Sequence, residues 1–304
     1  MNSADDYDDV LASLAASIGS IHFVLFGGAA LSRATFCPIR PRDLDIAIAG
    51  HVTAMHQVLP LLASACFNLG PHRQFRLNAL ETCWLLEAEH RGWVLDISFV
   101  HRFAAIGQFS IDSLYLEYPG FAVIDEFNGL EALRAGQLIL RRSLSEENGL
   151  LLLNRVMAFA AKYSMRFGLS SINGDFALEL RDHLATSAQS AASYGGHDMA
   201  GFISTFFRAL RRSPRPHELL EDLLETNLFS TACPLLADII RARSSALLED
   251  VSGIESTGRL VAWLTAGADR REMRRLAKVL APLRIRPWNR SDQELLREVE
   301  SLAT

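Results

Sequence analysis

The chain has 304 residues, of which 49% are hydrophobic and 21% charged, so it can form one large or two modest globular domains. Its net charge of −5 excludes a global electrostatic attraction to nucleic acid. It contains no run of eighteen apolar residues, so no transmembrane helix is predicted.

The four cysteines and the acidic N-terminus bear on the compartment. Cys37, Cys66, Cys83 and Cys233 lack Cys-x-x-Cys spacing, which favours reduced thiols over a zinc site or a disulfide framework. The first residues are acidic, whereas a signal peptide starts with basic residues. We therefore expect a cytoplasmic protein with no membrane partner.

The first 142 residues combine helical and strand-like patterns. Helical periodicity or turn chemistry predicts helices at 5–18, 27–34, 52–67 and 111–116. Alternating or short apolar runs predict strands at 22–26, 44–49, 75–77, 82–88, 93–100, 121–127 and 138–140.

From about residue 143 only helical patterns remain. They predict helices at 146–167, 176–187, 199–211, 217–225, 234–248, 258–265, 271–280 and 291–302, with a linker at 187–196. The predicted fold is α+β, a mixed sheet flanked by helices followed by an all-helical region. Its predicted parts are 1–142, 143–190 and 191–304.

The strand at 22–26 runs into Gly27-Gly28 and a helix. Glycines at a helix N-terminus expose backbone N–H groups, and the helix dipole favours negative charge there. This turn is therefore a candidate site for the phosphates of a nucleotide.

Asp43 and Asp45 open the next apolar strand. Side chains two residues apart on a strand point the same way, so both carboxylates face one side. Paired carboxylates suit a Mg²⁺ ion that bridges phosphates. The simpler alternative is a strand end with solvated acids.

Asp96 is a lone acid in the apolar strand at 93–100. If that strand neighbours the first acidic strand, three carboxylates converge and can hold metal ions and accept the proton of an attacking hydroxyl. The structural alternatives are an acid on an edge strand or an acid paired with Arg102.

Several segments together resemble a known family. In chain order they are Gly27-Gly28-Ala29, Asp43-Leu44-Asp45, Asp96-Ile97-Ser98, 109–114, 124–131 and 155–163. They are similar, in the same order, to the head domain of the tRNA nucleotidyltransferase (CCA-adding enzyme) and bacterial poly(A) polymerase family. That family belongs to the DNA polymerase β-type nucleotidyltransferase superfamily. The resemblance covers about residues 20–168.

The resemblance implies a nucleotidyltransferase with a two-metal mechanism. Asp43 and Asp45 would be the metal ligands, with Mg as cofactor, and Asp96 the third catalytic acid. The expected nucleotide-binding residues are Gly27, Gly28, Arg33, Asp112 and Arg155. The expected partners are an NTP, ATP or CTP, and an RNA acceptor, tRNA being the family's usual one.

Departures from the family pattern concern the cations and the base-reading residues. Gly107-Gln108 stands where the family has Arg-Asp, and the family's base-reading Asp and Arg would fall near 148–152, where neither type occurs. Arg33, Arg42, Arg102 and Arg155 are candidate replacements for the missing phosphate-binding arginines.

Three functions therefore remain open. The leading one is addition of nucleotides to an RNA 3′ end, in a tRNA-processing role. The alternatives are transfer to a small-molecule or protein acceptor, and a catalytically silent member of the fold. Two arginine clusters, at 208–215 and 270–290, are candidate RNA-contacting surfaces or simply solvated helix faces.

Overall fold

The fold is described from a computed structural model, which places residues 7–35, 41, 43–76, 82–190, 196–241, 256–266, 268–284 and 290–304. The chain divides into two compact units, Met1–Glu146 and Glu147–Thr304. The predicted division into 1–142, 143–190 and 191–304 stays a prediction. No helix within the placed ranges is both long and apolar enough to cross a membrane.

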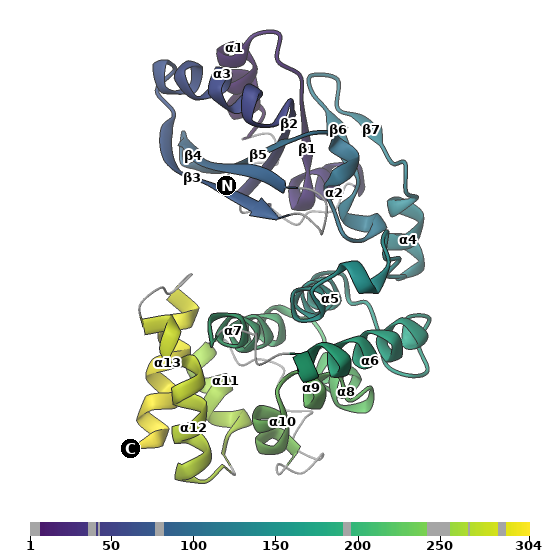
Figure 1. Cartoon of the computed structure of the whole chain (residues 1–304), viewed down its shortest axis with the longest axis vertical. Helices are drawn as coiled ribbons and strands as arrows, with labels where there is room; N and C mark the ends of the chain where they lie inside the picture. The colour runs from purple at the N-terminus through teal and green to yellow at the C-terminus, as the bar shows by residue number, and fades with distance from the viewer. Residues whose placement is uncertain are drawn as a thin grey trace. The chain divides into compact units, whose positions relative to one another are not determined.

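The first unit is built on a mixed sheet whose strands, within the placed residues, follow the order β3-β4-β5-β2-β1-β6-β7 (Figure 1). The strands are β1 (Phe23–Phe26), β2 (Asp43–Ala49), β3 (Asn68–Arg76), β4 (Thr82–His90), β5 (Trp93–Val100), β6 (Tyr115–Glu117) and β7 (Ala122–Ile124). The helices are α1 (Asp8–Ile18), α2 (Gly27–Thr35), α3 (His51–Ser64) and α4 (Gly129–Ala135). Strands β2 and β5 are parallel, and the other neighbours are antiparallel.

The main core of this unit lies on one face of the sheet. Leu44, Ile46 and Ile48 of β2 are fully buried there, in a cluster with apolar side chains of α1 and α3. The intervening β2 residues, Asp43 and Asp45, therefore point to the opposite face. The alternation predicted from the sequence is confirmed.

Three local predictions in this unit were wrong. Strand β3 starts at Asn68 rather than 75, because Pro71 is tolerated on an edge strand at an irregularity between Leu69 and His72. The predicted helix at 111–116 is a 3₁₀ turn followed by β6. The predicted strand at 138–140 contributes only an isolated bridge from Leu140 to Phe109.

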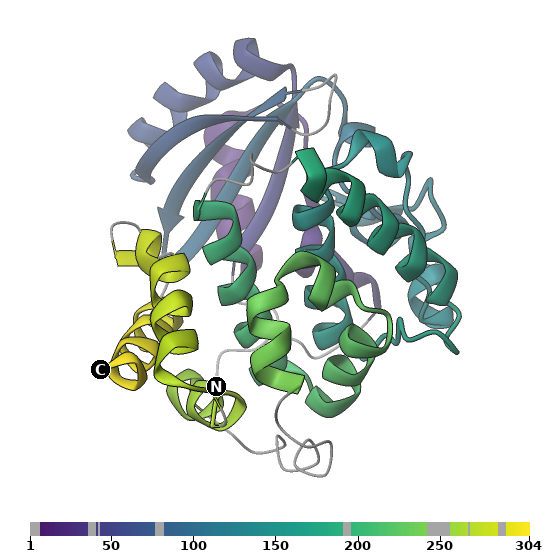
Figure 2. The same ribbon diagram turned by 60° about the horizontal axis from the view of Figure 1, so that its bottom comes forward.

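The second unit contains helices and no strand among its placed residues (Figure 2). They are α5 (Gly149–Tyr163), α6 (Gly174–Ser190), α7 (Gly196–Arg212), α8 (Pro216–Glu225), α9 (Leu228–Ala232), α10 (Pro234–Arg241), α11 (Thr257–Leu264), α12 (Arg270–Leu280) and α13 (Arg290–Ala303). Helix α6 continues to Ser190 and α7 begins at Gly196, so both ends of the predicted linker at 187–196 are helical, and residues 191–195 lie outside the described part of the chain. Helix α9 was not predicted. Phe202, Phe206 and Phe207 of α7 are completely buried, as their helical spacing predicts.

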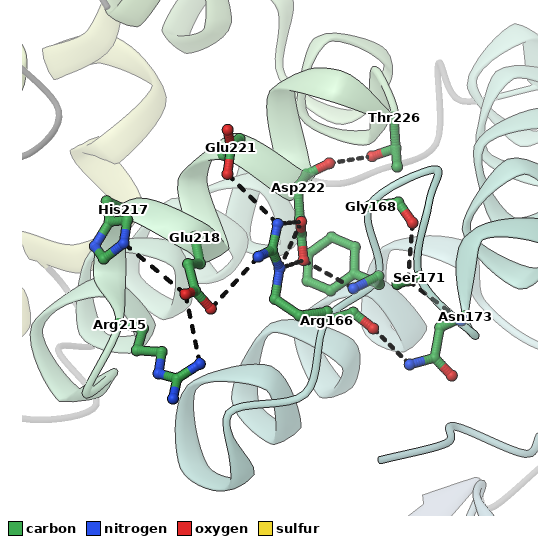
Figure 3. A network of polar contacts seen from close by, with 11 residues as sticks. Arg166, Gly168, Ser171, Asn173, Arg215, His217, Glu218, Glu221, Asp222 and Thr226 are labelled. Atoms are coloured by element: carbon green, nitrogen blue, oxygen red, sulfur yellow. Dashed lines mark hydrogen bonds and ion pairs between the residues drawn. The ribbon is translucent and has the colours of Figure 1, made fainter. Parts of the chain in front are cut away.

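A buried ion pair fastens the segment after α5 to α8 (Figure 3). Asp222, whose side chain is 0% exposed, accepts hydrogen bonds from Nε of Arg166 at 2.9 Å and from the Phe167 N–H at 2.8 Å. Arg166 also pairs with Glu218 at 3.5 Å and Glu221 at 3.4 Å. Every oxygen of Asp222 thus has a partner, as a buried charge requires.

Candidate active site

Two carboxylates of β2 meet a third on β5. In the parallel pairing of these strands Asp45 lies directly opposite Asp96, and Asp43 opposite Val94. Leu95, Ile97 and Phe99 are buried in the core on the other face, so Asp96 shares its face with Asp43 and Asp45. The sheet order therefore fulfils the condition under which the three carboxylates converge.

The environment of Asp96 disfavours its charged form. Burial raises the pKa of this carboxyl above its ordinary value, and the negative charges of Asp43 and Glu87 raise the pKa further. Arg73 acts in the opposite direction on the same pKa. A half-buried carboxylate beside like charges is typical of a site that binds a cation or moves a proton.

The Gly27-Gly28 turn lies against this group of carboxylates. Strand β1 ends at Phe26, which pairs with Asp45, and α2 begins at Gly27. Gly27 has φ of +64°, and a Cβ there would overlap the Asp45 carboxylate, with Cγ only 2.9 Å away. Only glycine allows this approach, which brings the α2 N-terminus and its N–H groups next to Asp45.

The carboxylates suit a divalent cation in their chemistry. Asp43 and Asp45 supply the oxygen ligands that Mg²⁺ prefers, and a cation would relieve the like-charge crowding around Asp96. In the placed part of the chain no ready-made group of three or more His, Cys, Asp or Glu side chains encloses a metal position. The residues thus fit Mg²⁺ by type and face, and its binding stays a prediction.

Arg33 is engaged on the core side of the first unit. Its guanidinium forms an ion pair with Asp8 of α1 at 2.6 Å and lies 3.6 Å from the ring centre of Phe121. Binding a triphosphate through Arg33 would require breaking the contact with Asp8, so its predicted role carries that added requirement.

Asp112 serves a structural purpose in the 3₁₀ turn. It is 8% exposed, and its Oδ1 accepts the backbone N–H of Phe109 at 2.8 Å. A contact between Asp112 and a nucleotide sugar stays a prediction.

The remaining arginine candidates are spread over the chain. Arg155 is an exposed residue of α5, in the second unit, and Arg102 is exposed in the segment after β5. Arg42 lies outside the residues that the structure describes.

Arg141 is a further cation, which no motif in the sequence singles out. Its guanidinium donates to the carbonyl oxygens of Ala104 at 2.6 Å and Gly107 at 3.1 Å, and to Oγ of Ser113 at 2.8 Å. Gly107, which replaces the family's arginine, has φ of +86°, and a Cβ there would lie 2.8 Å from Asp112 Oδ1. Arg141 thus fastens this loop through its carbonyl oxygens. The conformation of the loop at position 107 leaves no space for an arginine side chain.

Comparison with known proteins gives a likeness of fold. No family model matches the chain, and no curated protein does. A structure described as a tRNA-processing enzyme, apo form I, superposes with a TM-score of 0.61 at 13% identity, covering 99% of this chain and 78% of that one. A CCA-adding enzyme in complex with CTP gives 0.59 at 12% identity over 98% and 69%.

A third similar structure is the Thermotoga maritima CCA-adding enzyme complexed with tRNA, with a TM-score of 0.58 at 12% identity over 97% of this chain and 69% of that one. These likenesses extend over both units of the chain, beyond residues 20–168 where the sequence resemblance was found. The chain thus has the fold of CCA-adding enzymes, to which its sequence is only distantly similar.

Proposed function

We propose that the chain is a Mg²⁺-dependent nucleotidyltransferase that transfers a nucleoside monophosphate from an NTP to an RNA 3′ end. The observation that carries the proposal is the meeting of Asp45, Asp96 and the glycine turn at one place on the sheet. Similar solved structures contain CTP, ATP and tRNA, which supports these substrate classes.

The proposed roles combine the positions of the residues with the family resemblance. Asp43 and Asp45 would hold the metal, which when bound neutralises the charge on the phosphate oxygens. The N–H groups of Gly27 and Gly28 would bind the triphosphate. Asp96 would accept the proton of the 3′-hydroxyl, whose oxygen forms a bond to the α-phosphorus while the bond to the β-phosphate oxygen breaks and pyrophosphate leaves.

An RNA acceptor is supported by the charge of the C-terminal segment. Residues 256–304 carry ten basic and six acidic side chains in a chain of net charge −5. On α12 the exposed cations are Arg270, Arg271, Arg274, Arg275 and Lys278, whereas Met273, Leu276 and Leu280 of the other face are buried. Such a stripe of cations suits a phosphate backbone.

The other arginine cluster is more engaged within the protein. Arg208 donates to Thr205 Oγ1 at 3.0 Å, and Arg215 pairs with Glu218 at 3.5 Å. By contrast, Arg270, Arg271 and Lys278 form no ion pair with any carboxylate among the described residues. The α12 stripe is therefore the better candidate for RNA contact.

A different acceptor is the second candidate, because the base-reading positions have other tasks. Asn148 caps α5 by accepting N–H groups of Leu150 and Leu151, and Gly149 and Leu152 are buried. The absence of a base-reading pair weakens the case for a nucleic-acid template and for addition of nucleotides in a fixed order. Transfer to a small-molecule or protein acceptor is consistent with this absence, and so is a catalytically silent member of the fold.

The test is Mg²⁺-dependent incorporation from each labelled NTP into a tRNA lacking its 3′ end and into total RNA. Asp43→Ala/Asp45→Ala provides the blank. Label in RNA that disappears in the blank supports the proposal and identifies the nucleotide. Nucleotide binding without labelled RNA favours another acceptor, and loss of both favours the silent fold.

A further inference from the structure

A hollow of about 240 Å³ lies over β3, β4 and the start of β5. Its lining includes Gly70, Glu87, Glu89 and Val94. The hollow is smaller than the roughly 300–1,000 Å³ typical of pockets for drug-sized ligands. It therefore fits a single sugar or a group of similar size.

Strand register places this hollow relative to the carboxylates. Glu87 lies opposite Asp96, and Val94 lies opposite both Asp43 and Glu89. Since Leu86 and Ala88 belong to the core face, Glu87 and Glu89 share the open face with the catalytic acids. The hollow thus lies on the same face of the sheet as the three carboxylates, and its lining residues Val94 and Glu87 are register neighbours of Asp43 and Asp96.

The hollow and the glycine turn lie on opposite sides of the carboxylates. In the order β3-β4-β5-β2-β1, Gly27 follows β1, whereas the hollow lies over β3 and β4. In phosphoryl transfer the attacking and leaving oxygens are roughly in line across the phosphorus. If the pyrophosphate leaves on the Gly27 side, the attacking hydroxyl approaches the α-phosphorus from the side of the hollow.

Arg73 brings a positive charge to this otherwise acidic face. Its guanidinium lies 3.3 Å from the Glu87 carboxylate, and the two side chains are 59% and 42% exposed. An exposed pair of this kind contributes about 0–1 kcal/mol to stability, so a phosphate can replace the carboxylate as partner at little loss. Glu87 lies opposite Asp96 on the neighbouring strand, so the Arg73 contact with Glu87 lies next to the proposed catalytic acid.

We propose that the hollow is the acceptor subsite, where the terminal ribose of an RNA 3′ end lies with its hydroxyls toward Glu87 and Asp96 and with its phosphate on Arg73. This inference rests on the proposed function. It adds a binding residue, Arg73, that is absent from the expected arginines at 33, 42, 102 and 155.

Gly70 keeps the hollow open. A Cβ at this position would lie 3.2 Å from the Glu87 carbonyl oxygen and 3.3 Å from its Cβ, so any longer side chain would fill the space. Its φ lies outside the left-handed region, so its own backbone conformation accepts a side chain, while Glu87 has to move by a few tenths of an ångström to admit the Cβ.

The first experiment compares Arg73→Ala with Arg91→Ala, which removes an exposed cation of the β4–β5 turn that pairs with Asp9 at 3.7 Å. The KM for the RNA acceptor and for the NTP is measured for each. We expect the acceptor KM to rise about 10-fold in Arg73→Ala alone, with the NTP KM unchanged, and Arg73→Lys to recover part of the loss. An acceptor KM equal to that of Arg91→Ala would overturn the proposal.

A binding measurement tests the subsite without turnover. A fluorescent trinucleotide with a free 3′-hydroxyl is titrated into the wild type, Arg73→Ala, Arg91→Ala and Gly70→Val. About 10-fold weaker binding in Arg73→Ala and Gly70→Val supports the subsite, and equal affinity in all four overturns it. If Arg73→Ala and Gly70→Val show the expected loss of affinity but the wild type incorporates no nucleotide, the proposed function is refuted and the binding subsite is retained.

Discussion

The two units use buried carboxylates in opposite ways. Asp222 of the second unit is fully buried and its oxygens accept hydrogen bonds from Arg166 and from the Phe167 N–H. Asp96 of the first unit is half-buried, and this burial, together with the negative charges of Asp43 and Glu87, raises its pKa. The negative charge of Asp222 is compensated by its partners, whereas a bound cation would be favourable beside Asp96.

This difference separates a structural acid from a candidate catalytic one. A paired buried carboxylate joins elements, and its removal harms the fold. Crowded carboxylates lower stability, so they persist where a ligand or a reaction uses them. The predictions below test whether the two groups of acids behave in these opposite ways.

The largest expected effect concerns Asp45. Asp45→Asn should reduce nucleotide incorporation by a factor of about 10³ or more, because it removes a metal ligand at the reacting phosphate. Incorporation of labelled nucleotide measures the loss, and circular dichroism checks the fold. The control is Asp9→Asn, an acid of α1 whose side chain is 83% exposed. Retained activity in Asp45→Asn would contradict a catalytic role for the carboxylates of the first unit.

The corresponding change in the second unit should affect stability instead. Asp222→Ala leaves Arg166 without its buried partner and should lower the free energy of unfolding by about 3–5 kcal/mol. Chemical denaturation followed by circular dichroism measures it. Glu221→Gln, which removes a partner that is 64% exposed, should change stability by less than about 1 kcal/mol. Similar losses in both variants would contradict the structural role of Asp222.

Part of this contrast could be predicted from the sequence. The period-two alternation of β2 gave the shared face of Asp43 and Asp45, and apolar runs gave the other central strands. The proximity of Asp45 and Asp96 could not be deduced from either strand, because β3 and β4 intervene in the chain and pair elsewhere. From the residues alone this proximity was only a condition on which strands are neighbours, and the family resemblance supported it.

Other residues gave no usable local signal. Arg73 was missed because Gly70-Pro71 suggests a loop, although β3 is an edge strand that tolerates both residues. Asp222 is one acid among several on α8, and its burial depends on Arg166, which is distant in sequence. Arg141 likewise acts on carbonyl groups more than thirty residues upstream. Long-range side-chain partners of this kind require the tertiary structure.

The third prediction tests the close approach of the glycine turn to Asp45. Gly27→Ala should reduce activity and destabilise the protein by about 2–4 kcal/mol, because it adds overlap with the Asp45 carboxylate to the backbone strain at φ of +64°. Gly19→Ala is the matched control, since Gly19 has φ of +65° with no atom within 4 Å of the added Cβ. It should lose only about 1–2 kcal/mol, with activity retained. Equal effects of the two changes in thermal denaturation and incorporation would disprove the contact.

The smallest expected effect is a gain in stability on neutralising Asp96. Because the folded-state pKa of Asp96 is raised, its charged form opposes folding, and this penalty grows as pH rises through that pKa. Asp96→Asn should therefore match the wild type below about pH 3.8, the ordinary Asp value, and become more stable than the wild type toward neutral pH. Denaturation midpoints across this range measure the difference, with the exposed Glu179→Gln of α6 as control.

The same variant links the charge crowding to the proposed cation. If Mg²⁺ relieves the repulsion among the three carboxylates, added Mg²⁺ should stabilise the wild type more than Asp96→Asn and so reduce the advantage of the variant at neutral pH. A destabilised Asp96→Asn at neutral pH would mean that Asp96, like Asp222, is held by partners that favour its charge. The two units would then use their buried acids in the same way.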